Sequence, residues 1–361
     1  MSGMNPIIMI QLLLQYHNYK DDGNRVFKFV KNHRMRVHLE TNEEMSHRKS
    51  LLAPEYREWA KNALRSALSK TLNGKLGTVY IDQKMSKMAV PLQMSTGSNG
   101  YGTMPSGSRM DIPEGRFVRA FTYWEKVNDI DLSCFALTED GRQREFSWRN
   151  MYKNQGTDIC FSGDETSGFE GGSEYFDIDI DLFRKNHTEF RYLVFCDNIY
   201  SGIENVRFDD YNVTAGFMIR EKMEPGTRGY YRSQYYTNTL QPKVDIFEPK
   251  TVKTSFKLKS NSRFAYIFAI DMKTRQMIWL DIAREGNYAV AGTTKMNWLL
   301  DYMTITDVYN LHDLFNDLAT TVTTDPAIAD VIISDENFVN IEKPIIHSWD
   351  TEKIFQYLNA G

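Results

Sequence analysis

The chain has 361 residues, of which 42% are hydrophobic and 25% are charged, and this is the composition of a globular protein of about two or three domains. With 43 Lys and Arg against 47 Asp and Glu, the formal net charge is −4, so the sequence lacks the basic excess expected of a nucleic-acid-binding surface. The aromatic share of 13% favours strands, because aromatic side chains pack well on a pleated, half-buried surface.

The cysteines and the N-terminal segment indicate where in the cell the protein is expected to act. The three cysteines, Cys134, Cys160 and Cys196, are odd in number and widely spaced, which argues against a disulfide framework and against a zinc site. They are expected to be buried thiols in a reducing compartment, and the protein is expected to be cytoplasmic. The apolar run Ile7–Leu14 is far shorter than the roughly 20 residues that span a bilayer. It predicts a buried or partner-facing helix and no transmembrane segment.

Residues 1–110 are predicted to form an N-terminal α/β unit. A helix is expected from Ala53 to about Thr71, because Pro54 suits the first helical position and apolar residues recur at three- and four-residue spacing. The apolar stripe consists of Tyr56, Trp59, Ala60, Ala63, Leu64, Ala67 and Leu68. A strand follows at 76–82, and the Gly- and Ser-rich stretch from Ser95 to Ser108 is the candidate linker.

From Phe117 the sequence changes to short strands separated by turns, with no long helical stripe between them. This pattern predicts an antiparallel sandwich rather than a parallel sheet with crossover helices. The predicted strands are 117–124, 131–137, 145–148, 158–161, 175–182, 192–196, 214–220, 251–257, 264–271 and 276–282. We therefore assign residues 115–292 to a β-sandwich domain.

Helix-like spacing of apolar residues begins again near residue 295. Residues 293–361 are therefore predicted to form a C-terminal helical extension with a short α/β segment. One apolar face contains Val308, Leu311, Leu314, Phe315 and Leu318. A strand is expected at 330–334 and a last helix from about Asp350. The predicted fold class is mainly β, with α/β flanks on both sides of the sandwich.

Two segments concentrate oxygen-bearing side chains: 128–133, which contains Asp129 and Asp131, and 161–174. The second contains Asp164, Glu165, Glu170 and Glu174 together with four glycines that allow a tight loop. Calcium takes about 6–8 oxygen ligands in a flexible shell, so this loop is a candidate calcium site. It contains no His or Cys for zinc, does not fit the EF-hand pattern, and leaves magnesium or a simple solvated acidic turn as alternatives.

The run Asp177–Leu182 is also acidic. Strict alternation of Asp with Ile or Leu predicts a strand with Asp177, Asp179 and Asp181 on a solvated face.

These segments, in their order, resemble the TerD family of tellurium-resistance and stress-response proteins. The matching pieces are Asp129–Ser133, Phe146–Asn150, Ser162–Gly168, Glu174, Tyr192–Phe195 and Ala215–Arg220. The resemblance covers roughly residues 115–290. It extends to a longer subfamily through 77–82, 107–109, 247–249 and 325–330. The family implies a β-sandwich that binds calcium at one end through acidic loops.

Carried onto this sequence, Asp129 and Asp131 match the paired aspartates of the family, Asp164 the aspartate of its Gly-Asp-Asn turn, and Glu174 its closing glutamate. Glu165 replaces the usual Asn, and the acidic stretch before Glu174 is thinned here, which leaves the number of ions open. The metal ligands are therefore predicted among Asp129, Asp131, Asp164, Glu165, Gly168, Glu170 and Glu174, with Ca²⁺ as the ion.

Three functions are compatible with these features. The first is a non-enzymatic, calcium-binding interaction module of a tellurium-resistance or stress-response system, with other stress-response or assembly proteins as partners. The second is a structural or assembly protein, for example a phage-encoded scaffold, which the tyrosines near 230–236 and a possible homo-oligomer would suit. The third is a hydrolase that uses clustered carboxylates.

Overall fold

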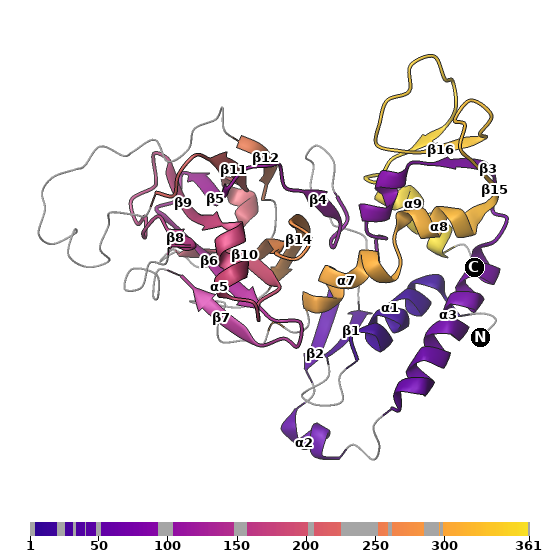
Figure 1. Cartoon of the computed structure of the whole chain (residues 1–361), viewed down its shortest axis with the longest axis horizontal. Coiled ribbons are helices and arrows are strands. Elements are labelled where there is room, and N and C mark those ends of the chain that lie inside the picture. Colours follow the sequence, from indigo (N-terminus) through magenta and orange to yellow (C-terminus); the bar gives the residue numbers. More distant parts are fainter. Residues whose placement is uncertain are drawn as a thin grey trace, which may run out of the picture. The chain divides into compact units, whose positions relative to one another are not determined.

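The computed structural model describes residues 4–19, 26–31, 34–39, 41–47, 52–92, 104–147, 157–200, 206–224, 252–258, 262–284, 296 and 299–359. The predicted linker up to residue 103, the tyrosines near 230 and the segments 148–150 and 247–249 lie outside these residues. The chain divides into two compact units (Figure 1): residues 110–296, and residues 1–109 together with 297–361.

Residues 110–296 form a mainly antiparallel β-sandwich. One sheet has the order β4(Arg109–Asp111)-β14(Gln276–Arg284)-β13(Phe264–Asp271)-β10(Tyr192–Tyr200)-β6(Asp129–Leu137)-β7(Gln143–Phe146). The other has the order β12(Val252–Lys257)-β11(Asn212–Arg220)-β5(Phe117–Glu125)-β9(Gly172–Asp179)-β8(Ile159–Phe161). This confirms the predicted β-rich class, and every strand predicted for the sandwich has a counterpart among these elements.

Aromatic rings pack the two sheets against each other. Phe161 and Phe176 stack at 4.8 Å within one sheet, and Phe195 and Phe268 lie 5.0 Å apart within the other. Phe176 meets Phe195 across the interface with ring centroids at 6.1 Å. Such rings bury large apolar areas and prefer offset or tilted contacts, so they set the spacing of the sandwich. The three cysteines are free and buried, as expected.

The prediction that Asp177–Leu182 forms one strand with its aspartates on a solvated face is wrong. Strand β9 ends at Asp179, where helix α5 (Ile180–Asn186) begins, because the Asp179 carboxylate accepts a hydrogen bond from Leu182 N at 3.1 Å and caps the helix. Asp177 is fully buried, since Arg119 lies directly opposite it on β5 and donates to both of its oxygens at 2.7 and 2.8 Å. Alternation alone did not reveal that a buried arginine covers this face.

The second unit is built around a parallel sheet with the order β15(Ala319–Thr323)-β3(Leu76–Ile81)-β16(Val331–Ile333)-β17(Ile345–Ile346). Strand β3 belongs to the N-terminal segment, and both of its neighbours belong to the C-terminal segment. Gly77 permits a close contact here, because a Cβ at this position would lie 2.4 Å from Asp330 Oδ2, which accepts Thr78 N. The flanks that the sequence analysis treated as separate regions therefore share one sheet.

Helices pack around this sheet and share its core. They are α1 (Pro6–His17), α3 (Pro54–Leu72), α7 (Leu300–Val308), α8 (Leu311–Leu318) and α9 (Thr351–Asn359), with the 3₁₀ turn η1 (Gln83–Lys87). Asn5 caps α1 by accepting Ile7 N at 2.8 Å, and Asn310 and Asp313 form a capping box at the start of α8. The core joins residues of both segments, such as Leu13, Leu68, Val79, Phe315 and Ile354. A hairpin, β1 (Val26–Lys31) with β2 (Arg34–Leu39), and a short helix α2 (Asn42–Ser46) complete the described elements of this unit.

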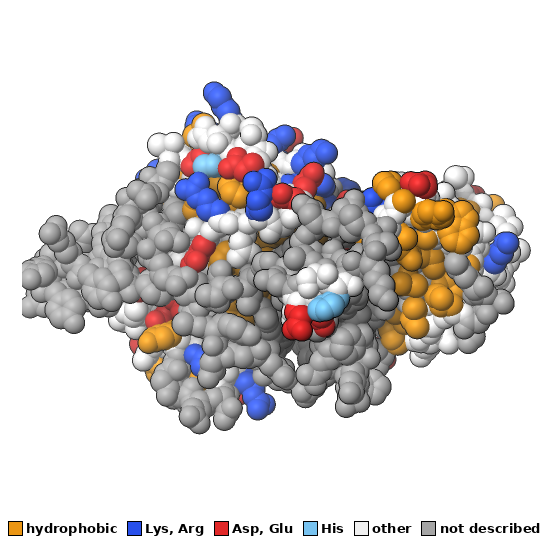
Figure 2. Space-filling model, turned by 90° about the horizontal axis from the view of Figure 1, so that it is seen from below, with side chains coloured by type: hydrophobic (Ala, Val, Ile, Leu, Met, Phe, Trp, Pro, Cys, Tyr) orange, Lys and Arg blue, Asp and Glu red, His pale blue; other side chains and the backbone are white. Residues whose placement is uncertain are grey.

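The helical stripe predicted on α3 is only partly buried. Leu64, Leu68 and Leu72 are buried, whereas Tyr56 and Trp59 are 62% and 66% exposed. The first turns of α3 thus carry surface aromatic residues. Figure 2 shows hydrophobic side chains gathered on the surface of this unit. In the described part of the chain, no helix is both long enough and apolar enough to cross a membrane.

The buried pair of Arg119 and Asp177 yields a stability prediction. Arg119→Met leaves the Asp177 carboxylate buried without its cation, which should lower the free energy of unfolding by about 3–5 kcal/mol in a urea titration. The double variant Arg119→Met/Asp177→Leu removes both charges and should recover a large part of that loss. A double variant no more stable than the single one would show that the charge pair is not the source of the effect.

Candidate metal centre

Two of the predicted ligands lie on β6. This strand is buried at all nine positions, and Asp129 and Asp131 are each only 7% exposed. Because side chains alternate along a strand, the two aspartates lie on the same face. Strand β7 pairs with Cys134–Leu137, so along Asp129–Ser133 this edge of β6 extends beyond β7.

The acidic loop between β8 and β9 runs along this edge. Gly168 N donates to Asn128 O at 2.7 Å, and Lys126 N donates to Phe169 O at 2.8 Å. The loop can approach so closely because residue 168 is glycine: a Cβ there would lie 2.4 Å from Trp124 Nε1 and 2.8 Å from Gly172 Cα. The loop therefore provides partners for backbone groups of the turn that leads into β6.

Glu174, at the start of β9, links the loop to β6 through its buried carboxylate. Its side chain is fully buried; one carboxylate oxygen accepts Leu132 N at 2.8 Å and the other accepts Glu165 N at 3.0 Å. Burial raises the pKa of Glu174 well above its usual value, and Asp131 and Asp164 raise it further, while the two N–H donors act in the opposite direction. Glu174 thus positions the loop next to β6.

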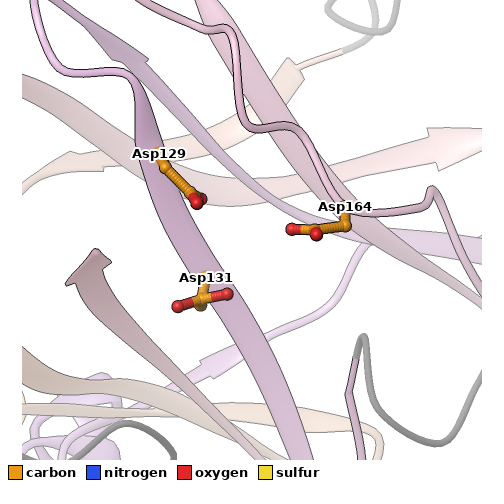
Figure 3. Close-up of side chains that lie close together, drawn as sticks. All are labelled: Asp129, Asp131 and Asp164. Atoms are coloured by element: carbon orange, nitrogen blue, oxygen red, sulfur yellow. The ribbon is translucent and has the colours of Figure 1, made fainter. Parts of the chain in front are cut away.

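The result is a cluster of three carboxylates, Asp129, Asp131 and Asp164 (Figure 3). One oxygen from each can be chosen so that all three lie within 4.8 Å of one another. The two aspartates of β6 face the same space from the strand, and Asp164 faces it from the loop. A ligand set of carboxylate oxygens suits a hard cation such as calcium or magnesium.

The electrostatics of the cluster fit a cation. Burial raises the pKa of Asp129 to about 8, and the carboxylates of Asp131, Asp164 and Glu165 add to this effect. Asp129 Oδ1 is buried and has no hydrogen-bond partner. Buried polar atoms are nearly always paired, so an orphaned carboxylate oxygen facing two other carboxylates is the kind of atom that a bound cation satisfies.

Of the seven residues predicted as ligands, the structure brings these three together. The other four do not join the cluster: Glu174 binds backbone N–H groups as above, and Glu165, 4% exposed, accepts Ser167 N at 3.0 Å. Gly168 makes the close approach to Trp124, and Glu170 is exposed on the loop.

Sequence reasoning missed two neighbours of the cluster. Asn198, on β10, is paired directly with Asp131, and its Nδ2 lies 3.4 Å from Asp131 Oδ2. Trp124, on β5, is fully buried against Gly168 and Gly172. Neither carries a local signal, because their role follows from strand register and from the packing of the loop.

No protein-family model matches the sequence, and no curated protein matches it. Among solved structures, the chain is similar to a homologue of the telluride resistance protein TerD from Streptomyces coelicolor A3(2), with 11% identity and a TM-score of 0.34 over 51% of this chain and 98% of that one. It is also similar to a protein of unknown function, with 13% identity and a TM-score of 0.29 over 47% of this chain and 92% of that one. A TerD homologue is thus among the similar structures, as the sequence resemblance predicted. With TM-scores below 0.5, neither neighbour says anything about the metal centre.

The raised pKa of Asp129 predicts how stability depends on pH when no divalent cation is bound. The folded-state pKa of about 8 lies above the unfolded value of 3.8, so between these pH values the folded state binds a proton that the unfolded state has lost. Stability therefore falls as pH rises toward 8 and levels off above it. With chelator present, the thermal unfolding midpoint should decrease between pH 6.5 and pH 8.5. Asp129→Asn, which cannot ionise, should flatten this slope. An unchanged slope in the variant would assign the dependence to other groups.

Proposed function

We propose that this chain is a non-enzymatic, calcium-binding interaction module of the tellurium-resistance or stress-response type, acting in the cytoplasm. The observation that carries the proposal is the cluster of Asp129, Asp131 and Asp164, in which the two aspartates of β6 are buried and Asp129 Oδ1 has no protein partner. The order of strands and acidic loop, which resembles the TerD family, supports the biological setting.

Calcium suits this centre better than the other common cations. The cluster offers only oxygen ligands, which disfavours zinc. Magnesium requires a near-ideal octahedron and usually retains several waters, whereas calcium accepts irregular sets of carboxylate and carbonyl oxygens. A loop whose shape is set by backbone hydrogen bonds to Lys126 and Asn128, just before β6, provides that kind of irregular set. When bound, the cation supplies positive charge that offsets the repulsion among the three aspartates.

The described nucleophile candidates favour a binding role over catalysis. Burial raises the pKa of Cys160 to about 12, with Asp177 adding to the effect, and burial raises the pKa of Cys134 and Cys196 well above the usual thiol value. Thiols with raised pKa values stay protonated and unreactive. Buried, reduced cysteines also agree with a cytoplasmic protein.

Thermal unfolding with calcium, magnesium or chelator tests the proposal. Calcium at 100 times its dissociation constant should stabilise the native state by about 2.7 kcal/mol, which raises the unfolding midpoint by about 5–10 °C for a domain of this size. Asp164→Ala removes the ligand supplied by the loop and should abolish most of this shift.

Glu170→Gln is the matched control, since it removes a carboxylate from the same loop that lies outside the cluster, and it should keep the wild-type shift. Absence of a calcium shift in the wild-type protein would contradict the proposal. A shift of equal size with magnesium would contradict the choice of ion.

A further inference from the structure

A buried amide beside the cluster has an oxygen without a partner. Asn198 is 4% exposed, and its Oδ1 has no hydrogen-bond partner. Buried polar atoms are nearly always paired, so a buried amide oxygen without a protein partner is unusual. Asn198 contacts Asp131, and Asp131 clusters with Asp129, whose Oδ1 is also buried without a partner. Both unpaired oxygens therefore belong to residues of one group of side chains.

The strand register places Asn198 at this site. Asn198 lies directly opposite Asp131 in the antiparallel pair of β10 and β6, and directly opposite residues have their Cβ atoms about 4.5–5.5 Å apart on the same face. The amide already contacts the cluster, since Nδ2 lies 3.4 Å from Asp131 Oδ2, a long and therefore weak hydrogen bond. The end of the Asn198 side chain is thus directed at Asp131, one of the three clustered aspartates.

We propose that Asn198 is a further ligand of the metal centre and supplies a neutral amide oxygen through Oδ1. This inference rests on the proposed function, because it assigns a residue to the same calcium site. An amide exchanges its oxygen and nitrogen when it turns by about 180° around its terminal bond. In the structure, Nδ2 donates to Asp131 Oδ2. With calcium bound, the turned amide presents Oδ1 to the cation.

The charge balance explains why an amide suits this position. Calcium carries two positive charges, and the three aspartates already carry three negative charges when ionised. A fourth carboxylate would add repulsion in a buried place, whereas an amide adds an oxygen without adding charge. Calcium accepts amide and carbonyl oxygens readily, so a neutral ligand raises the coordination number at low electrostatic cost. Asn198 therefore complements the carboxylates supplied by β6 and the loop.

Two substitutions separate a ligand from a residue that only holds Asp131 in place. Asn198→Ala removes both the oxygen and the N–H donor. Asn198→Asp keeps an oxygen at the same distance along the side chain but removes the donor. If Asn198 is a ligand, the alanine variant should bind calcium more weakly by about tenfold or more, whereas the aspartate variant should bind calcium at least as tightly as wild type.

Isothermal titration with calcium and with the trivalent ion terbium provides the measurement, and thermal unfolding in chelator shows whether each variant is folded. The aspartate variant should also favour terbium over calcium more strongly than wild type, because it adds a negative charge. Asn212→Ala is the control: Asn212 lies on β11 in the same sandwich and donates to Glu125 at 3.1 Å, outside the cluster. It should leave calcium binding unchanged.

The outcomes separate this inference from the function on which it rests. Equal weakening in Asn198→Ala and Asn198→Asp would overturn the ligand role and leave the calcium site in place, because the donor to Asp131 would then be the important group. Unchanged binding in Asn198→Ala would overturn it too. Failure of the wild-type protein to bind calcium in the same titration would overturn both proposals.

Discussion

The carboxylate cluster depends on one physical constraint, which is that buried backbone groups at the start of β6, on the edge beyond β7, must be paired. The loop between β8 and β9 pairs the carbonyl of Asn128, just before β6. The Glu174 carboxylate binds the N–H group of Leu132 on β6 and that of Glu165 in the loop. Once the loop is fixed in this way, Asp164 lies against the two aspartates of β6. The position of the cluster therefore follows from how a sandwich edge is closed.

This closure concentrates negative charge in a place from which water is largely excluded. Burial and mutual repulsion raise the pKa of Asp129 to about 8 and that of Glu174 well above its usual value. The fold contains two different solutions to buried acidity. Asp177 is balanced by the guanidinium of Arg119, which is held in the same sheet. The three aspartates that form the cluster at β6 include no such cation, and the proposed calcium ion would take its place.

The organisation of the chain adds a second constraint. Strand β3 pairs on one side with β15 and on the other with β16, so the N-terminal segment completes its sheet only with strands from the C-terminal segment. The shared core contains α1 and α3 from one segment and α8 and α9 from the other. Because parallel strands need crossover connections and buried faces, neither segment can form this sheet alone. The sandwich is thus inserted into the sequence of a discontinuous α/β unit.

The sequence by itself determined the β-rich class, the strands of the sandwich, the apolar N-terminal helix and the acidic loop, because period-two alternation, glycine-rich turns and apolar runs are local signals. It also identified Asp129, Asp131 and Asp164, whose residue types and spacing suggest a metal before any fold is known. Only the tertiary structure decided that Glu174 binds backbone N–H groups, that Asp177 meets Arg119, that Asn198 lies beside Asp131, and that the two flanks share one sheet. Each of these depends on pairing between residues far apart in the chain, and strand register and long-range packing leave no trace in local sequence.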